Sequence, residues 1–447
     1  MNSFLNKIFC TKFLTLILFV SHQTFCLDTP NFYKTPHLFE PRDIPENNWL
    51  ANVDVQYSNG STYRGRNKNS DKVNALNIYG HHNLLYMTSN VPNPTNASAT
   101  ALANITNINN KRTAYEAANL PASNTFGKVE FHGKFEVDEL LILFRQNFVN
   151  KFFGEINLPI RRTRFSHFSY TDKSPDDTGN YTKNDTVWNP FLNNNLDTVL
   201  RAYGIKPPSV GNKKTGFGDI TMLVGFHSEI PNVNEFTKYM KVIFKGGLLF
   251  PTGSQRNFNI PLSVEHGYNG HFGVPIHLDV LFGLSNDVFI GTYSDLTVFF
   301  EKTFNHYRIK SDEKQNGFIK LHKAKIREEK GMLFDLGSYI KLDHFFEGLS
   351  ALAGYSFVSK IKDTLSVSSS SVNVGGAIAN GDNRLKNWNF HTLHLAVEYD
   401  LGMHEPFNSK KWQPHFEIFY DYPFSGKRVF MAPHIGGLVG CTFKWDF

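Results

Sequence analysis

Charged side chains recur at every second position in several segments of this 447-residue chain, with apolar residues at the positions between them. Around residue 243, for example, Lys241 and Lys245 alternate with Met240, Val242 and Phe244. Residues two apart on an extended strand share one face, so the charges gather on one side of the strand. Facing a wet lumen, such charges set ion and solute preference; in a narrow barrel they instead pair with one another. We predict this lumen-lining position for Asp54, Glu155, Arg161, Asp219, Lys241, Lys245, Asp279, Asp335, Lys341, Glu398, Glu417 and Asp421.

Other chemistry finds little support in the sequence. His81 and His82 are adjacent, and neighbours on a strand point to opposite faces, so the pair would not converge on a metal ion. The remaining His and Cys residues lack metal-ligand spacing. Gly216-Phe217-Gly218 precedes a predicted strand and not a helix, which argues against a phosphate-binding loop. We therefore expect no enzyme activity, no metal site and no cofactor.

The elements that position the charged residues are strands, because a period of two recurs along the chain and a period of 3.6 is rare. Two assignments stay open. The second strand is long and its alternation shifts near Asp138, which indicates a bulge or an additional hairpin. The seventh carries Phe289 and Tyr293 on one face but Val288 and Ile290 on the other. The twelve predicted strands are 48–58, 127–148, 152–165, 216–229, 238–251, 273–283, 287–302, 331–343, 349–364, 388–401, 413–422 and 433–447.

The connections between these strands alternate between long and short. Outer-membrane barrels have long extracellular loops and short periplasmic turns, whereas a soluble β-sandwich has no reason to sort its loops in this way. The Asn-rich loop 59–126 and the Ser-rich loop 365–387 are expected to be mobile or surface-exposed and unable to bury a core. The long connections are 59–126, 166–215, 252–272, 303–330, 365–387 and 423–432; the short ones are 149–151, 230–237, 284–286, 344–348 and 402–412.

The N-terminus has the pattern of a secretory signal peptide. Lys7 and Lys12 precede a short apolar run that ends at Val20. The run is too short for a membrane-spanning helix, although an uncleaved anchor helix is the alternative. We predict that residues 1–26 are the signal peptide, that residues 27–47 form a periplasmic segment or a partial plug, and that residues 48–447 form the barrel.

Composition narrows the class of protein further. Aromatic residues make up 15% of the chain, charged residues only 19%, and the mean hydropathy is −0.32. This polarity excludes a bundle of apolar membrane helices, whereas membrane strands with one wet face produce such a mixture. Loss of Lys7 and Lys12 with the signal peptide lowers the formal charge from +6 to +4, and no basic block suggests nucleic-acid binding. Of the 3 cysteines, only Cys441 lies outside the signal peptide, so no intramolecular disulfide is expected.

The last residues carry the most specific motif. Val439, Cys441, Phe443, Trp445 and Phe447 lie on one face of the final strand, and the chain ends on an aromatic residue. This pattern resembles the terminal strand of bacterial outer-membrane barrels, which, the resemblance implies, is recognised by the barrel assembly machinery. Because no backbone polar group can stay unpaired in hydrocarbon, a membrane-spanning sheet must close on itself. The predicted fold is an all-β transmembrane antiparallel barrel of about 12 strands, within a range of roughly 10 to 14, in the bacterial outer membrane in contact with its lipid.

Two narrower resemblances concern function. The stretch Gly216-Phe217-Gly218-Asp219, followed by a hairpin that ends in Pro251-Thr252-Gly253, resembles the outer-membrane family linked to meta-pathway degradation of phenols, which implies a transport channel. Gln56-Tyr57-Ser58-Asn59-Gly60 is similar to the His-x-Ser-Asn-Gly motif of outer-membrane phospholipases, which use a Ser and a His on the lipid-facing surface. Gln56 stands in the place of the His and cannot act as a general base.

The sequence therefore predicts a porin-like channel for passive diffusion of small solutes through a polar lumen of mixed charge. The alternative is a closed structural or adhesin-like barrel that acts through its long loops. A phospholipase is the remote alternative. The solute, the oligomeric state and the partners of the loops are not specified by the sequence.

Overall fold

The computed structural model describes residues 49–121, 123–148, 151–177, 180–231, 233, 236–370, 374–404 and 411–445. The predicted signal peptide 1–26, the predicted N-terminal segment 27–47 and the terminal Phe447 lie outside these residues.

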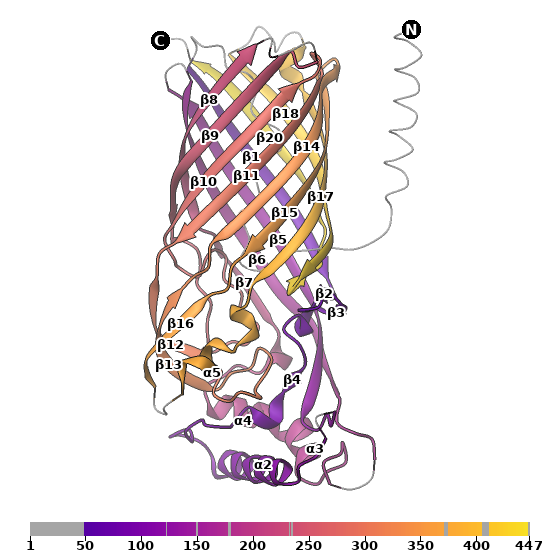
Figure 1. The fold of residues 1–447 in the computed structure, drawn as a ribbon, viewed down its shortest axis with the longest axis vertical. Helices are drawn as coiled ribbons and strands as arrows, with labels where there is room; N and C mark the ends of the chain where they lie inside the picture. Colours follow the sequence, from indigo (N-terminus) through magenta and orange to yellow (C-terminus); the bar gives the residue numbers. More distant parts are fainter. Residues whose placement is uncertain are drawn as a thin grey trace.

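Twelve strands form a closed antiparallel barrel (Figure 1). Each strand pairs with the next one in the chain, and the last strand pairs with the first from Trp49↔Trp445 to Gly60↔His434, which closes the sheet. This architecture confirms the predicted fold, the predicted resemblance to outer-membrane barrels and all twelve strand positions. The strands are β1 (Trp49–Thr62), β5 (Lys128–Asn147), β6 (Phe152–Asp172), β8 (Ile220–Pro231), β9 (Tyr239–Phe250), β10 (Gly273–Gly283), β11 (Val288–Phe299), β14 (Leu333–Phe346), β15 (Leu349–Lys360), β17 (Trp388–Asp400), β18 (Trp412–Lys427) and β20 (His434–Trp445).

The outer face of the barrel is apolar. On β10, Ile276 and Leu278 point outward and are 37% and 40% exposed, whereas the alternating residues His277 and Asp279 point inward and are buried. A continuous exposed belt of this kind is stable only when lipid covers it, and the closed sheet leaves no strand edge unpaired in hydrocarbon. The barrel is thus an outer-membrane barrel. None of the described helices is long and apolar enough to cross a membrane.

Both open strand assignments are resolved. Residues 128–147 form one strand that pairs with β6 along its length, so the additional hairpin considered near Asp138 is wrong. The irregularity lies between His132 and Lys134 instead. On β11, Phe289 and Tyr293 are buried inside the barrel, and Ile290 is exposed on the outer face.

The long connections gather at one end of the barrel and build a folded layer there, at the lower end of Figure 1. This corrects the expectation that these loops cannot bury a core. Strands β12 (Lys302–Ile309), β13 (His322–Glu329) and β16 (Thr364–Ser370) pair into a small sheet. The other elements of this end are β2 (Arg64–Arg66), β3 (Lys72–Asn74), η1 (Ala75–Asn77), β4 (His82–Asn83), η2 (Leu84–Tyr86), α2 (Ala99–Ala117), α3 (Trp188–Pro190), η3 (Phe191–Asn195), α4 (Leu196–Ala202), η4 (Pro208–Val210), β7 (Asn212–Phe217), α5 (Gly376–Asn380), η5 (Asn383–Leu385) and β19 (Val429–Phe430), while η6 (Leu401–Met403) lies in a periplasmic turn.

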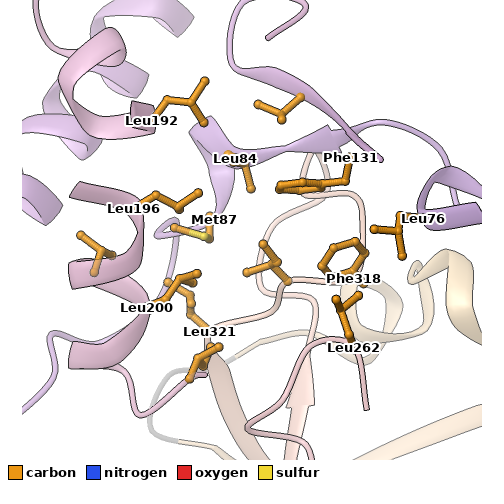
Figure 2. Packing of buried hydrophobic residues seen from close by; sticks show 14 of the residues in the cluster. Leu76, Leu84, Met87, Phe131, Leu192, Leu196, Leu200, Leu262, Phe318 and Leu321 are labelled. Atoms are coloured by element: carbon orange, nitrogen blue, oxygen red, sulfur yellow. The ribbon is translucent and has the colours of Figure 1, made fainter. Parts of the chain in front are cut away.

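We call this folded layer the extracellular layer, because the long loops of outer-membrane barrels lie on the extracellular side. Several loops contribute residues to its core (Figure 2). Leu84 and Met87 of the first loop pack with Leu200 of α4 and Leu321 of the β12–β13 loop. Each loop is too polar to bury a core alone. The expectation that the loops bury no core is wrong because apolar residues far apart in the sequence share one core. The Asn-rich stretch contributes to this core as helix α2. Ser98 caps the N-terminus of the helix, and one helix face buries Ile105 and Ile108.

His82, from the adjacent histidine pair, is a core residue. Its ring packs edge-on against Phe131 and Phe318, with ring centroids at 4.6 and 4.2 Å. Burial lowers the pKa of His82 to about 3, so the ring is neutral. His81 is exposed. Among the described residues, no group of three or more His, Cys, Asp or Glu side chains is placed to hold a metal ion.

Candidate functional site

The structure places all twelve predicted lumen residues on the inner side of the barrel. Eleven project inward from strands, and Asp219 lies immediately before β8. Nine are buried, whereas Glu398, Glu417 and Asp421 are partly exposed. Such burial means that these charged side chains pack against neighbouring inward side chains or against the loops.

One wall of the lumen is charged and hydrogen-bonding. Arg161 of β6 forms a buried salt bridge with Glu139, its partner in register on β5. Lys245 of β9 reaches Glu155 across β8, with Nζ and Oε2 3.2 Å apart. The guanidinium of Arg145 lies 3.7 Å from the ring centroid of Phe153. Paired charges of this kind are stable in a confined space because each satisfies the other.

Three histidines pair with inward carboxylates. His277 Nδ1 lies 2.7 Å from Asp295, His394 Nδ1 lies 2.8 Å from Asp421, and His415 Nε2 lies 2.9 Å from Asp54. The set of lumen residues predicted from the sequence did not include these histidines or Asp295. Their positions were available in the alternation, because each sits at an inward-facing position of its strand.

The opposite wall carries an apolar patch among its charged residues, so the predicted polar lumen of mixed charge is only part of the lining. Inward side chains from six consecutive strands form one buried cluster, which we call the lumen cluster: Leu281, Phe289, Tyr293, Tyr339, Leu352, Ala396 and Phe419. In the strand order, β14 lies six strands from β5, which places the lumen cluster across the barrel from the charged wall. Tyr339 donates a hydrogen bond to Asp279 at 3.0 Å and so joins the two kinds of surface.

The connection between β9 and β10, residues 251–272, folds over the extracellular end of the lumen, and we call it the plug loop. Asp219 fixes it: one carboxylate oxygen accepts the Gly253 N–H at 2.7 Å and the other accepts the Tyr268 N–H at 2.5 Å. Thr252 Oγ1 donates to the Gly218 carbonyl at 3.0 Å and accepts from the Ile220 N–H at 2.9 Å. These are residues of the two glycine-containing motifs in the sequence, and the structure shows that they fasten the loop.

Residues of the charged wall also form hydrogen bonds with the plug loop. Arg161 donates to the His266 carbonyl at 3.0 Å, and the His266 ring lies 3.1 Å from the Thr163 hydroxyl and 3.0 Å from the Ser254 hydroxyl. Burial lowers the pKa of His266 to about 3, so the ring is neutral and bonds two hydroxyl groups without carrying charge. The plug loop is therefore fixed by polar contacts at both of its ends.

Apolar side chains complete the closure. Tyr268 of the plug loop packs against Phe299 with ring centroids 4.6 Å apart, and Val429 and Met431 enter from the β18–β20 connection. Together with inward residues at the extracellular ends of the strands they form one cluster, which we call the mouth plug: Leu249, Tyr268, Phe299, Leu333, Val358, Trp388, Phe390, Val429 and Met431. Sequence periodicity did not reveal these contacts, because the loop residues have no strand phase.

The predicted assembly motif lies on the lipid-facing side. Val439 and Phe443 are 56% and 36% exposed on the outer face, and Cys441 shares their phase. The backbone of Trp445 pairs with that of Trp49, and Phe447 lies outside the described residues. Recognition by the assembly machinery stays a prediction.

The motif that is similar to a phospholipase motif, residues 56–60, has its Gln and Ser on the inner face of the barrel. Gln56 and Ser58 are buried on the inner face of β1, whereas a lipase of that type requires its serine on the lipid-facing surface. This orientation removes the geometric basis for the phospholipase alternative.

Comparison with known proteins gives matches of shape and none of sequence. No protein-family model matches the chain, and no curated protein matches it. An outer-membrane channel from Pseudomonas putida F1 is 11% identical, with 90% of this chain and 97% of that chain covered and a TM-score of 0.46. A FadL homologue from Pseudomonas aeruginosa is 8% identical, with coverages of 90% and 91% and a TM-score of 0.30. The monoaromatic hydrocarbon channel CymD is 8% identical, with coverages of 90% and 90% and a TM-score of 0.30. At these values the similarity is one of general barrel architecture, and the resemblance to the meta-pathway family stays a resemblance.

Proposed function

We propose that the protein is an outer-membrane channel that lets small solutes pass passively along the charged wall of its lumen when the plug loop moves aside. The observation that carries this proposal is the polar inner face of β1, on which Asn52, Asp54, Gln56 and Ser58 are all buried. Polar side chains of β5 and β6 flank it from Asn147 near the periplasmic end to the Arg161–Glu139 pair beneath the plug loop, with Leu141 and Leu143 as apolar interruptions on β5. A barrel that served only as a scaffold could fill this space with apolar side chains at no cost in buried charge.

Unpaired polar atoms on this wall support a hydrated path. Within the described part of the chain, the Ser58 hydroxyl, the Asn147 amide and Asn157 Oδ1 are buried without a hydrogen-bond partner. A buried polar group without a hydrogen-bond partner lowers the stability of the fold by about 1–3 kcal/mol. Water or a passing solute would supply the missing partners, and the groups are spaced along the barrel axis on three adjacent strands.

Conductance across planar bilayers tests the proposal. We expect small or rare conductance steps from the full-length protein. A Tyr268→Ala/Met431→Ala variant should give larger or more frequent conductance steps, because both substitutions remove apolar side chains from the mouth plug. Val439→Ala, on the lipid-facing side, is the matched control and should behave like the parent protein. Each form is measured with and without residues 27–47, the predicted N-terminal plug.

The channel proposal fails if the plug variant, shown to be folded by its heat-modifiable migration on gels, conducts no ions in either form. A closed barrel acting through its extracellular layer would then be favoured. That second candidate rests on one observation: the long loops build a core of their own, which is far more structure than a connection between strands requires. Deleting residues 59–126 should abolish partner binding by an adhesin, whereas a pore would keep or gain conductance.

A further inference from the structure

A cavity of about 90 Å³ lies where the mouth plug, the extracellular core and the small β12–β13–β16 sheet meet. Its wall includes Leu76 and Ile78 of the first loop, Val264 of the plug loop, and Tyr307 and Trp388. The cavity therefore lies directly outside the closure of the lumen, and the plug loop supplies one side of it.

Most charges at this cavity are already matched. Lys360 forms a salt bridge with Asp363, and Arg384 donates to Asp382 at 2.7 Å. Glu328 lies 3.4 Å from His271 Nε2. Burial alone would raise the pKa of Glu328, but neighbouring Lys330 and His271 outweigh it and hold the pKa below its ordinary value.

Two opposite charges are left over, and both come from the plug loop. Arg256 and Glu265 line the cavity and are partly buried. In the part of the chain that the structure describes, the Arg256 guanidinium and the Glu265 carboxylate take part in no hydrogen bond or salt bridge, including one with each other. Lys214 lies near both and is itself occupied by three backbone carbonyls, those of Ser254, Gln255 and Val264.

A free cation and a free anion in one partly apolar cavity match a ligand that carries both charges. A guanidinium binds a carboxylate through paired N–H donors, and a carboxylate binds an ammonium group. A cavity of roughly 150 Å³ accommodates the six carbon atoms of benzene, so about 90 Å³ limits the enclosed part of a ligand to about four non-hydrogen atoms.

We propose that this cavity binds a small zwitterion, such as a short α-amino acid, with its carboxylate on Arg256, its ammonium group on Glu265 and its side chain against the apolar wall. The proposal deepens the channel function and rests on it, because it names the class of solute that meets the plug loop first. A ligand held by two plug-loop residues contacts the segment that must move for passage.

Binding to the full-length protein in detergent micelles tests the site without any conductance measurement. The probes are L-alanine, propionate, which lacks the ammonium group, and ethylamine, which lacks the carboxylate. Titration calorimetry should show alanine binding at least tenfold more tightly than either analogue. Arg256→Gln should weaken alanine at least tenfold and leave ethylamine unchanged, while Glu265→Gln should weaken alanine and leave propionate unchanged.

Arg201→Gln, on the exposed face of α4, and Glu313→Gln, in the β12–β13 loop, are matched controls that should leave alanine binding unchanged. Equal binding of the three probes, no alanine binding, or unchanged binding in the Arg256 and Glu265 variants would overturn the site. If alanine fails to bind while the plug variant still conducts, the zwitterion site is refuted and the channel stands. If alanine binds but no form conducts, the channel is refuted and the cavity is a surface receptor site.

Discussion

Asp219 offers the most direct way to move the plug loop without touching its apolar contacts. Its buried carboxylate accepts two backbone N–H groups of the loop, those of Gly253 and Tyr268. A hydrogen bond to a charged group contributes about 1.5–3 kcal/mol, so removing both should weaken the docked loop by about 3–6 kcal/mol. At about 1.4 kcal/mol per factor of ten, the ratio of docked to undocked loop should fall by roughly two to four orders of magnitude.

We therefore expect Asp219→Ala to raise the open probability of single channels strongly and to make the plug loop sensitive to added protease. Asp219→Asn should have roughly half the effect, because its carbonyl oxygen still accepts one N–H while the charge and the second acceptor are lost. Asp138→Ala is the matched control, since Asp138 pairs with Arg162 on the outer side of the barrel and does not contact the loop. An Asp219→Ala protein that conducts with the parent's open probability and resists protease at residues 251–272 would refute the latch.

Three further predictions concern the extracellular layer. Burial lowers the pKa of Lys320 from 10.5 to about 8, so the unfolded chain binds more protons than the folded chain between these pH values. The extracellular layer should therefore gain up to about 3 kcal/mol of stability as pH rises from 8 to 10.5. Lys320→Met should remove this gain when denaturant unfolding is measured as a function of pH. Asp382→Asn should destabilise the layer by about 3–5 kcal/mol, because it leaves the buried cations of Lys320 and Arg384 without their carboxylate; a variant whose unfolding midpoint equals the parent's would contradict this. Phe131→Ala should cost about 3–5 kcal/mol by opening a cavity beside Phe318, which limited proteolysis would detect as cleavage of the layer while the barrel keeps its heat-modifiable migration.

The alternation of the sequence determined the barrel and its two faces. A period of two fixes which side of a strand each residue occupies, so the inward direction of Asp54 or Lys245 follows from local geometry, and closure follows from the need to pair every backbone group in lipid. The strand at 128–147 shows the limit of this reasoning, because its apparent change of phase near Asp138 is absent from the structure.

Only the tertiary structure decided what fills the lumen and what the loops build. Strand phase assigns a side chain to a face but not to a partner, so the pairing of His415 with Asp54, more than 350 residues away, depends on the closure of β20 onto β1. Loop residues have no phase at all, and the core around Leu84 and the latch from Asp219 to Tyr268 arise because closure of the sheet brings six connections to one end of the barrel. The sequence by itself thus determined the wall of the barrel, whereas contacts between distant segments determined its closure at the mouth.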